Sequence, residues 1–171
     1  MSFPRTSLLA VAAFTLLVSG CKVNTINSFP SHPASVRFIG LISDAATLDV
    51  KKDSNAVWTG IPFGQPTDYQ QFDNKQTTFS IFAPDRADEV TSASGSLAAN
   101  LPYTLVAFGT IGNPATVIQT DTFAKVTPGN TQLRFMHTAF GAGGLDIYLT
   151  SPGLPLSGHS PQYQMGFGNT T

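Results

Sequence analysis

The sequence predicts an all-β fold made of antiparallel β-sandwich modules. Its apolar segments are short, rich in Val, Ile, Thr, Phe and Tyr, and separated by turn residues, with 15 Gly and 12 Pro in 171 residues. No segment after residue 21 keeps a helical apolar period with caps. Hydrophobic residues make up 42% and charged residues 11% of the chain, enough apolar surface for a core. A disordered chain is therefore excluded.

The first element is a predicted export signal at residues 1–20. Arg5 gives a positive start, and residues 8–18 form an 11-residue run that is apolar except for Thr15. That run is much shorter than the roughly 20 residues of a membrane-spanning helix. It ends in Val18-Ser19-Gly20-Cys21, which resembles the bacterial lipobox. An ordinary signal peptide that is cleaved near a cysteine is the alternative.

The resemblance to a lipobox implies that the Cys21 thiol is lipidated and that Cys21 becomes the first residue of the mature chain. Cys21 is the only cysteine, so it has no disulfide partner within the chain. Two or three acyl chains would anchor the protein stably in a membrane. Lys22 replaces the Asp that favours inner-membrane retention in many Gram-negative bacteria, so the outer membrane is the expected destination. A polar tether at residues 21–34 would follow.

Seven strands are expected in the first module, which we place at residues 35–127. Strand-forming residues alternate with Gly, Pro, Asn and Asp over this region, as in a β-sandwich. Trp58, the only tryptophan, is expected in the core of the third strand. Tyr103 is either a corner tyrosine whose hydroxyl bonds back to the backbone or an ordinary aromatic residue at a strand start. The expected strands are residues 36–42, 47–51, 56–61, 77–83, 90–97, 103–109 and 116–123.

An internal repeat predicts a second copy of the module. Residues 36–50 align with residues 133–147 at an offset of 97, with five identities in 15 positions. Phe63-Gly64 recurs as Phe167-Gly168 at an offset of 104. The second copy, at residues 131–171, covers the equivalents of only three strands, so we expect a truncated module in a fragment of a longer protein.

The repeated units resemble a bacterial and archaeal family known as domain of unknown function 4397. The resemblance in the second copy rests on Arg134, His137, Asp146 and Tyr148, and in the first copy on Arg37, Ser43-Asp44-Ala45 and Leu48-Asp49-Val50. Gly40 and Lys51 depart from the family pattern, which has His and Tyr there. The resemblance implies tandem immunoglobulin-like sandwiches on an exported protein and declares no function.

The repeat also singles out two pairs of charged residues. Arg37 with Asp49, and Arg134 with Asp146, are expected on one outer face of adjacent strands, where each pair would form a cross-strand ion pair. Such a pair would fix the register between two strands. A ligand site is the alternative.

No pattern supports catalysis or a metal or other cofactor. His32, His137 and His159 lack the paired spacing of zinc ligands. Asp85, Asp88 and Glu89 lack the alternate spacing of a calcium loop, which favours a solvated turn. No Gly-x-Ser-x-Gly elbow is present, and the Gly-rich residues 141–144 precede a strand. A net charge of −1 without a basic stripe excludes nucleic acid as the expected partner.

The expected function is therefore that of a non-enzymatic, lipid-anchored protein of the cell envelope with a binding or structural role. The membrane, through acyl chains on Cys21, and an envelope protein or glycan are the expected partners. The alternative is a carbohydrate- or peptide-binding accessory module of an envelope enzyme or transporter. A flat exposed row of Tyr69, Phe72 and Tyr163 would favour glycan binding, and burial of all three would favour a scaffold.

Overall fold

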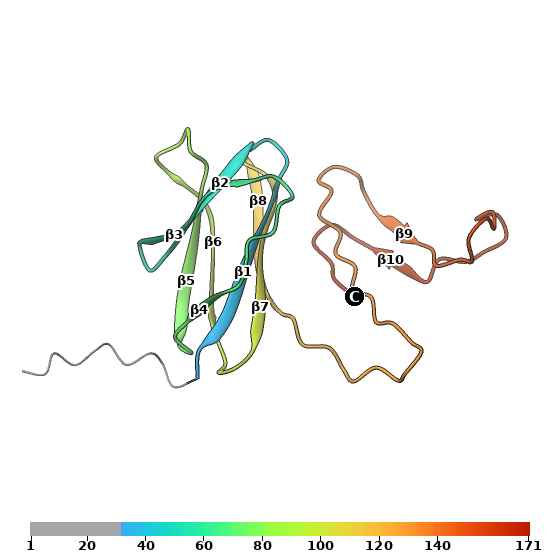
Figure 1. Cartoon of the computed structure of the whole chain (residues 1–171). Coiled ribbons are helices and arrows are strands. Elements are labelled where there is room, and N and C mark those ends of the chain that lie inside the picture. Colours follow the sequence, from blue (N-terminus) through green and yellow to red (C-terminus); the bar gives the residue numbers. More distant parts are fainter. Residues whose placement is uncertain (1–31) are drawn as a thin grey trace, which may run out of the picture.

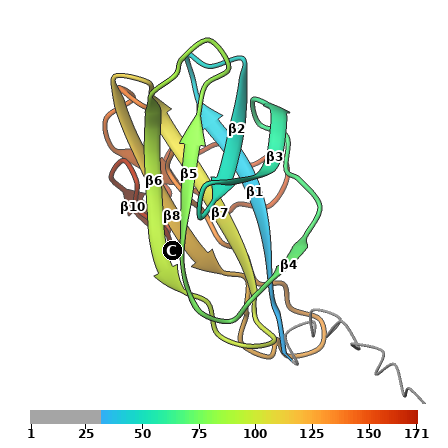
Figure 2. The same cartoon turned by 90° about the vertical axis from the view of Figure 1, so that its left-hand side faces the viewer.

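The computed structural model describes residues 32–171, and its first eight strands form two facing four-stranded sheets (Figures 1 and 2). One sheet has the order β4-β1-β7-β8 and the other the order β3-β2-β5-β6. The strands are β1 (Ala34–Ile42), β2 (Thr47–Lys52), β3 (Asn55–Pro62), β4 (Gln70–Phe72), β5 (Gln76–Phe82), β6 (Glu89–Ser96), β7 (Pro102–Thr110) and β8 (Asn113–Thr120). The predicted all-β class is confirmed.

The predicted signal at residues 1–20, Cys21 and the tether up to residue 31 lie outside the described residues. Within residues 32–171, no helix is long and apolar enough to cross a membrane.

The core lies between the two sheets, because alternate residues of each strand point inward. Val36 and Phe38 of β1 are fully buried, whereas Arg37 between them points to the outer face. Trp58 of β3 is 6% exposed and stacks on Phe38 and Phe79, with ring centroids 6.3 and 6.4 Å away. Each such buried side chain contributes about 1.5–3 kcal/mol. The predicted core role of Trp58 is confirmed.

One strand pair departs from the expected antiparallel arrangement. β1 and β7 are parallel, from Ser35 opposite Pro102 to Ile42 opposite Gly109. After β1 the chain forms β2 and β3 in the other sheet, returns to the first sheet for β4, crosses again for β5 and β6, and returns to form β7. In an immunoglobulin constant domain the first strand lies beside the second, whereas here β1 lies between β4 and β7. The strand order is thus different from that arrangement.

All seven predicted strands of the first module are present, and their ends differ by a few residues. The largest shift is in β8, which begins at Asn113 rather than Thr116 and ends at Thr120 rather than Phe123. Pro114 is tolerated because β8 is an edge strand, where a missing N–H breaks no ladder. β4 was not predicted, since its three residues, Gln-Gln-Phe, carry no strand pattern.

Tyr103, at the start of β7, is a corner tyrosine by its hydrogen bond. Its hydroxyl oxygen accepts a bond from the backbone N–H of Ala98, five residues earlier, at 2.9 Å. The ring is 6% exposed and belongs to the core cluster. The hydroxyl thus satisfies a backbone donor in the connection from β6 to β7.

The C-terminal segment forms a smaller unit, whose β9 (Leu145–Ile147) and β10 (Tyr163–Met165) pair in antiparallel fashion. Figure 1 shows it beside the sandwich, on the side of β7 and β8. Residues 133–136, expected as a strand, instead make an isolated bridge between Met136 and Thr170. That expectation was wrong, because a single bridge is not a continuous ladder of paired residues.

The smaller unit covers the outer face of β7. Val106 and Phe108 point away from the core, yet they are only 6% and 4% exposed. The ring of Phe167 lies edge-on to that of Phe108, with centroids 5.3 Å apart. β7 is therefore buried on both faces, as in a three-layered arrangement.

Candidate functional site

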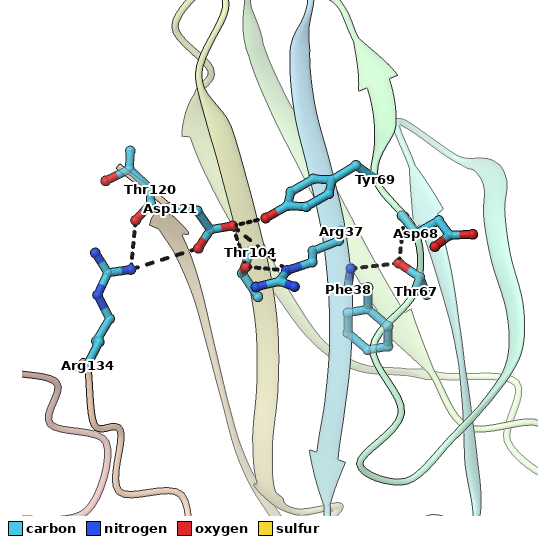
Figure 3. A network of polar contacts seen from close by, with 9 residues as sticks. All are labelled: Arg37, Phe38, Thr67, Asp68, Tyr69, Thr104, Thr120, Asp121 and Arg134. Carbon is cyan, nitrogen blue, oxygen red and sulfur yellow. Dashed lines mark hydrogen bonds and ion pairs between the residues drawn. The ribbon is translucent and has the colours of Figure 1, made fainter. Parts of the chain in front are cut away.

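A polar network lies on the outer face of the first sheet, around the carboxylate of Asp121 (Figure 3). Asp121 directly follows β8, Thr104 lies on β7, and Tyr69 directly precedes β4. Arg37 lies on β1 directly opposite Thr104 in the parallel register. Strands far apart in sequence therefore bring these four side chains together.

Two hydroxyl groups hold the carboxylate. Tyr69 and Thr104 each donate a hydrogen bond to Oδ2 of Asp121, both at 2.6 Å. The Thr104 hydroxyl in turn accepts a bond from Nε of Arg37 at 2.9 Å. Short bonds to a carboxylate are charge-assisted and stronger than neutral ones. Thr104 thus links the carboxylate to the guanidinium group.

Two arginines flank Asp121 from opposite parts of the chain. Nε of Arg37 lies 3.8 Å from Oδ2, and Nη1 of Arg134 lies 3.8 Å from Oδ1. Arg134 also donates to the backbone oxygens of Thr120 at 2.8 Å and Thr122 at 3.4 Å. Because Arg134 belongs to the C-terminal segment, this carboxylate joins that segment to the sandwich.

Tyr69 is held in its neutral form. Its pKa is raised above 10.0, first because burial disfavours the phenolate and second because its hydroxyl donates to the Asp121 carboxylate. The guanidinium carbon of Arg37 lies 5.0 Å from the centre of the Tyr69 ring and opposes this shift. The phenol therefore acts as a hydrogen-bond donor.

The network borders a groove of about 290 Å³ between the sandwich and the C-terminal segment. Its floor contains apolar outward residues of β1 and β7, among them Ile39, Leu41 and Val106. Met136 and Thr138 line its far wall. Asp121 partly offsets the charges of Arg37 and Arg134 at the groove. The polar groups here therefore bond mainly to one another.

The predicted pairs of Arg37 with Asp49 and of Arg134 with Asp146 are not formed. β1 and β2 belong to different sheets, so Arg37 and Asp49 lie on opposite sides of the sandwich. Oδ1 of Asp49 accepts a bond from the Gly60 backbone N–H at 2.7 Å. Asp146 accepts a bond from the Gln164 amide at 3.0 Å. The structure thus brings the two arginines together and leaves both predicted aspartates elsewhere.

His137 is a buried structural histidine, 2% exposed. Its Nε2 lies 2.7 Å from the Gly143 oxygen, and its Nδ1 accepts a bond from the Ala139 N–H at 3.3 Å. These partners fit the neutral ring with its proton on Nε2. Both ring nitrogens are thereby used in fixing the loop before β9.

Among residues 32–171, no group of three or more His, Cys, Asp or Glu side chains is placed to hold a metal ion. The side chain of Glu89, from the predicted solvated turn, bonds to Ser80 and Ser92, which lowers its pKa. Asp85 and Asp88 are exposed.

The three aromatic residues expected to distinguish a glycan platform from a scaffold do not form a row. Tyr69 is 44% exposed but bonded to Asp121, while Phe72 packs edge-on against Trp58 at 5.8 Å. Tyr163 is 44% exposed and lies in the C-terminal segment. Neither expected outcome is met, so these residues favour neither candidate function.

The central residue of the network, Asp121, was not predicted, nor was Thr104, and Tyr69 was considered only as a member of an aromatic row. No local motif marks them, since Arg37 and Thr104 meet only through the parallel pairing of β1 with β7. Thr104 does lie at an outward position of β7, and so alternation in that strand was the one available signal.

The part of the chain that contains this network matches a protein-family model. The model for DUF4397, a domain of unknown function, matches residues 34–148. The chain belongs to this family. The matched range of DUF4397 includes all eight strands of the sandwich, Asp121 and Arg134, and it crosses the boundary that we expected near residues 127–131. No curated protein matches the chain.

Proposed function

We propose that this DUF4397 chain is a non-enzymatic lipoprotein of the cell envelope that displays its β-sandwich from a membrane. Residues 1–20 serve as the export signal, Cys21 carries the acyl chains and residues 21–34 form the tether. The absence of an Asp after Cys21 favours the outer membrane. β1 begins at Ala34, the last residue of this tether.

The lipobox resemblance at residues 18–21 supports the anchor, and the observation that carries the non-enzymatic role is the use of the polar groups between the sandwich and the C-terminal segment. Asp121 bonds to Tyr69 and Thr104 and lies between two arginines, one from each unit. These groups are engaged in holding the C-terminal segment on the sandwich. Such an arrangement supports a structural or binding role, in which the sandwich and the C-terminal segment are presented together.

Membrane fractionation tests the anchor. The Cys21→Ala variant should move from the membrane fraction to the soluble fraction, because it has no thiol to acylate. The matched variant Lys22→Ala keeps the thiol and should stay in the membrane fraction. If Cys21→Ala remains with the membrane, the anchor proposal is wrong.

The second candidate is a peptide-binding accessory module, and one observation favours it. A cleft of about 680 Å³ lies in the C-terminal segment, lined by exposed Leu133 and Tyr163 together with Phe135 and Leu149. Apolar side chains around an open cleft are typical of ligand sites. This candidate needs no catalytic group.

A further inference from the structure

One guanidinium group in the groove between the sandwich and the C-terminal segment is only partly used by the protein. Arg37 donates through Nε to Thr104 and lies beside Asp121, and its side chain is 35% exposed. Its terminal nitrogens, Nη1 and Nη2, have no hydrogen-bond acceptor among residues 32–171. The planar guanidinium fork matches a carboxylate, which it binds through two parallel hydrogen bonds. Because Arg37 lines the groove, these donors are available to a ligand there.

The second arginine of the groove has its terminal nitrogens engaged. Arg134 donates through Nη1 and Nη2 to the backbone oxygens of Thr120 and Thr122, at 2.8 and 3.4 Å. Figure 3 shows the two guanidinium groups on opposite sides of Asp121. Arg134 therefore contributes its charge to the groove, whereas Arg37 contributes both a charge and hydrogen-bond donors.

The groove has an excess of positive charge. The charged residues that line it are Arg37, Arg134 and Asp121, two positive and one negative. The hydroxyl groups of Tyr69 and Thr104 already hold the Asp121 carboxylate within the protein. A carboxylate ligand bound to Arg37 would supply the second negative charge. The groove is therefore complementary to a ligand with a single negative charge.

Most of the remaining groove surface is apolar. Ile39, Leu41 and Val106 form the floor, and Met136 lies in the opposite wall. Ile39 and Leu41 are partly exposed, so their side chains can still be covered by a ligand. Apolar walls with a few placed polar groups are typical of small-molecule sites, whose volumes range from about 300 to 1,000 Å³. At about 290 Å³ this groove suits a small ligand.

Equivalent positions of the two units build the groove. Alternate residues from 37 to 41 on β1 line one side, and alternate residues from 134 to 138, at the repeat offset of 97, line the other. The groove therefore exists only while the C-terminal segment packs on the sandwich. Every residue that lines it lies between positions 37 and 138.

We infer that this groove binds a small carboxylic acid with an apolar chain. The carboxylate accepts hydrogen bonds from the terminal nitrogens of Arg37, and the chain lies on Ile39, Leu41 and Val106. Binding is reversible and no bond of the ligand is broken. The inference rests on the proposed binding role and names the chemical class of the ligand.

Octanoate is the probe. It is titrated into the full chain with Cys21→Ala, which has no thiol to acylate, so that no detergent competes for the ligand. Backbone amide signals are followed by NMR, and we expect saturable shifts within residues 37–41 and 134–138. Octanamide has the same chain without the charge, and acetate has the charge without the chain. Each should bind at least about tenfold more weakly than octanoate.

Substitutions test the role of the fork. Arg37→Gln should weaken octanoate binding about tenfold, because the charged fork is lost. Arg37→Lys keeps the charge without the fork and should give an intermediate affinity. Lys75→Gln removes the same charge at a 57% exposed position outside the groove and should leave the affinity unchanged. The amide signals of Phe108 and Phe167 report whether the C-terminal segment stays packed on the sandwich in each variant.

The inference is overturned if octanamide binds as tightly as octanoate, or if octanoate shifts signals only outside the groove. It is also overturned if Arg37→Gln, with the segment still packed, binds octanoate unchanged. The comparison with octanamide needs no substitution at Arg37, so it decides even if the segment detaches in that variant. Arg37→Gln keeps Cys21 and should stay in the membrane fraction, so a failed ligand site is distinguishable from a failed lipid anchor.

Discussion

One aspartate organises the polar contacts of the outer face. Asp121 is bonded to Tyr69 and Thr104 and lies 3.8 Å from nitrogen atoms of both Arg37 and Arg134. The sequence repeat correctly draws attention to both arginines, but it assigns each an aspartate within its own unit. The common partner was not predictable from the repeat, because Asp121 lies in the connection between the two units.

Because the pKa of Tyr69 is raised, part of the folding stability decreases as the pH rises in the alkaline range. The folded protein disfavours the phenolate. The contribution of Tyr69 to the free energy of unfolding is therefore fully present below pH 10.0, and it is lost as the pH rises through the pKa of Tyr69 in the folded protein. The Tyr69→Phe variant should therefore lose stability less steeply above pH 10 than the unmodified protein. Urea unfolding at several pH values measures this, with Tyr148→Phe as control. Equal slopes for Tyr69→Phe and the unmodified protein would refute the prediction.

At the scale of the elements, local patterns predict the strands but not all of their partners. The strand-forming residues of segments 36–42 and 103–109 correctly predict β1 and β7. Their parallel pairing cannot be read from either segment, because it depends on the crossing of the chain between sheets. Because this pairing could not be predicted, Arg37 was assigned the wrong ion-pair partner.

The hairpin from β7 to β8 depends on a glycine. Gly109 has φ of 99°, and a Cβ there would lie 2.5 Å from the backbone oxygen of Asn113. The Gly109→Ala variant should lower the free energy of unfolding by about 2 kcal/mol. Gly112→Ala is the matched control in the same hairpin, since a Cβ at Gly112 meets nothing within 4 Å. Urea denaturation measures both, and equal stabilities would contradict this explanation.

At the scale of the whole molecule, the C-terminal segment completes the burial of the first sheet. Phe108 is 4% exposed because the segment packs over it. The segment in turn exposes its own apolar residues, and among residues 32–171 nine of the eleven large exposed hydrophobic residues lie after residue 121. The sequence repeat predicts a second copy with the equivalents of only three strands, but the packing of Phe167 on Phe108 could not be predicted from it, because this contact depends on how the segment lies on the sandwich.

Phe167 is the apolar anchor of this contact. Its ring also lies 5.7 Å from Phe140 and 6.1 Å from His137, although it is 36% exposed. Phe167→Ala should weaken the attachment of the C-terminal segment to the sandwich by about 2 kcal/mol. This is less than replacing a fully buried phenylalanine by alanine costs, because Phe167 is partly exposed. Limited proteolysis should then cleave residues 123–131 faster, with unchanged Trp58 fluorescence. Leu156→Ala, at a 55% exposed position, is the control and should leave cleavage unchanged. Unaltered cleavage in Phe167→Ala would show that other contacts hold the segment.

The parallel pairing of β1 with β7 has a consequence for the time the chain needs to fold. The two strands meet across 67 residues of sequence, as between Arg37 and Thr104. Contacts of such long range require loop closure before they contribute, and they slow folding. β1 therefore cannot complete its sheet until β7 has been synthesised and, in an exported chain, translocated. Until then its apolar inner face needs protection from aggregation.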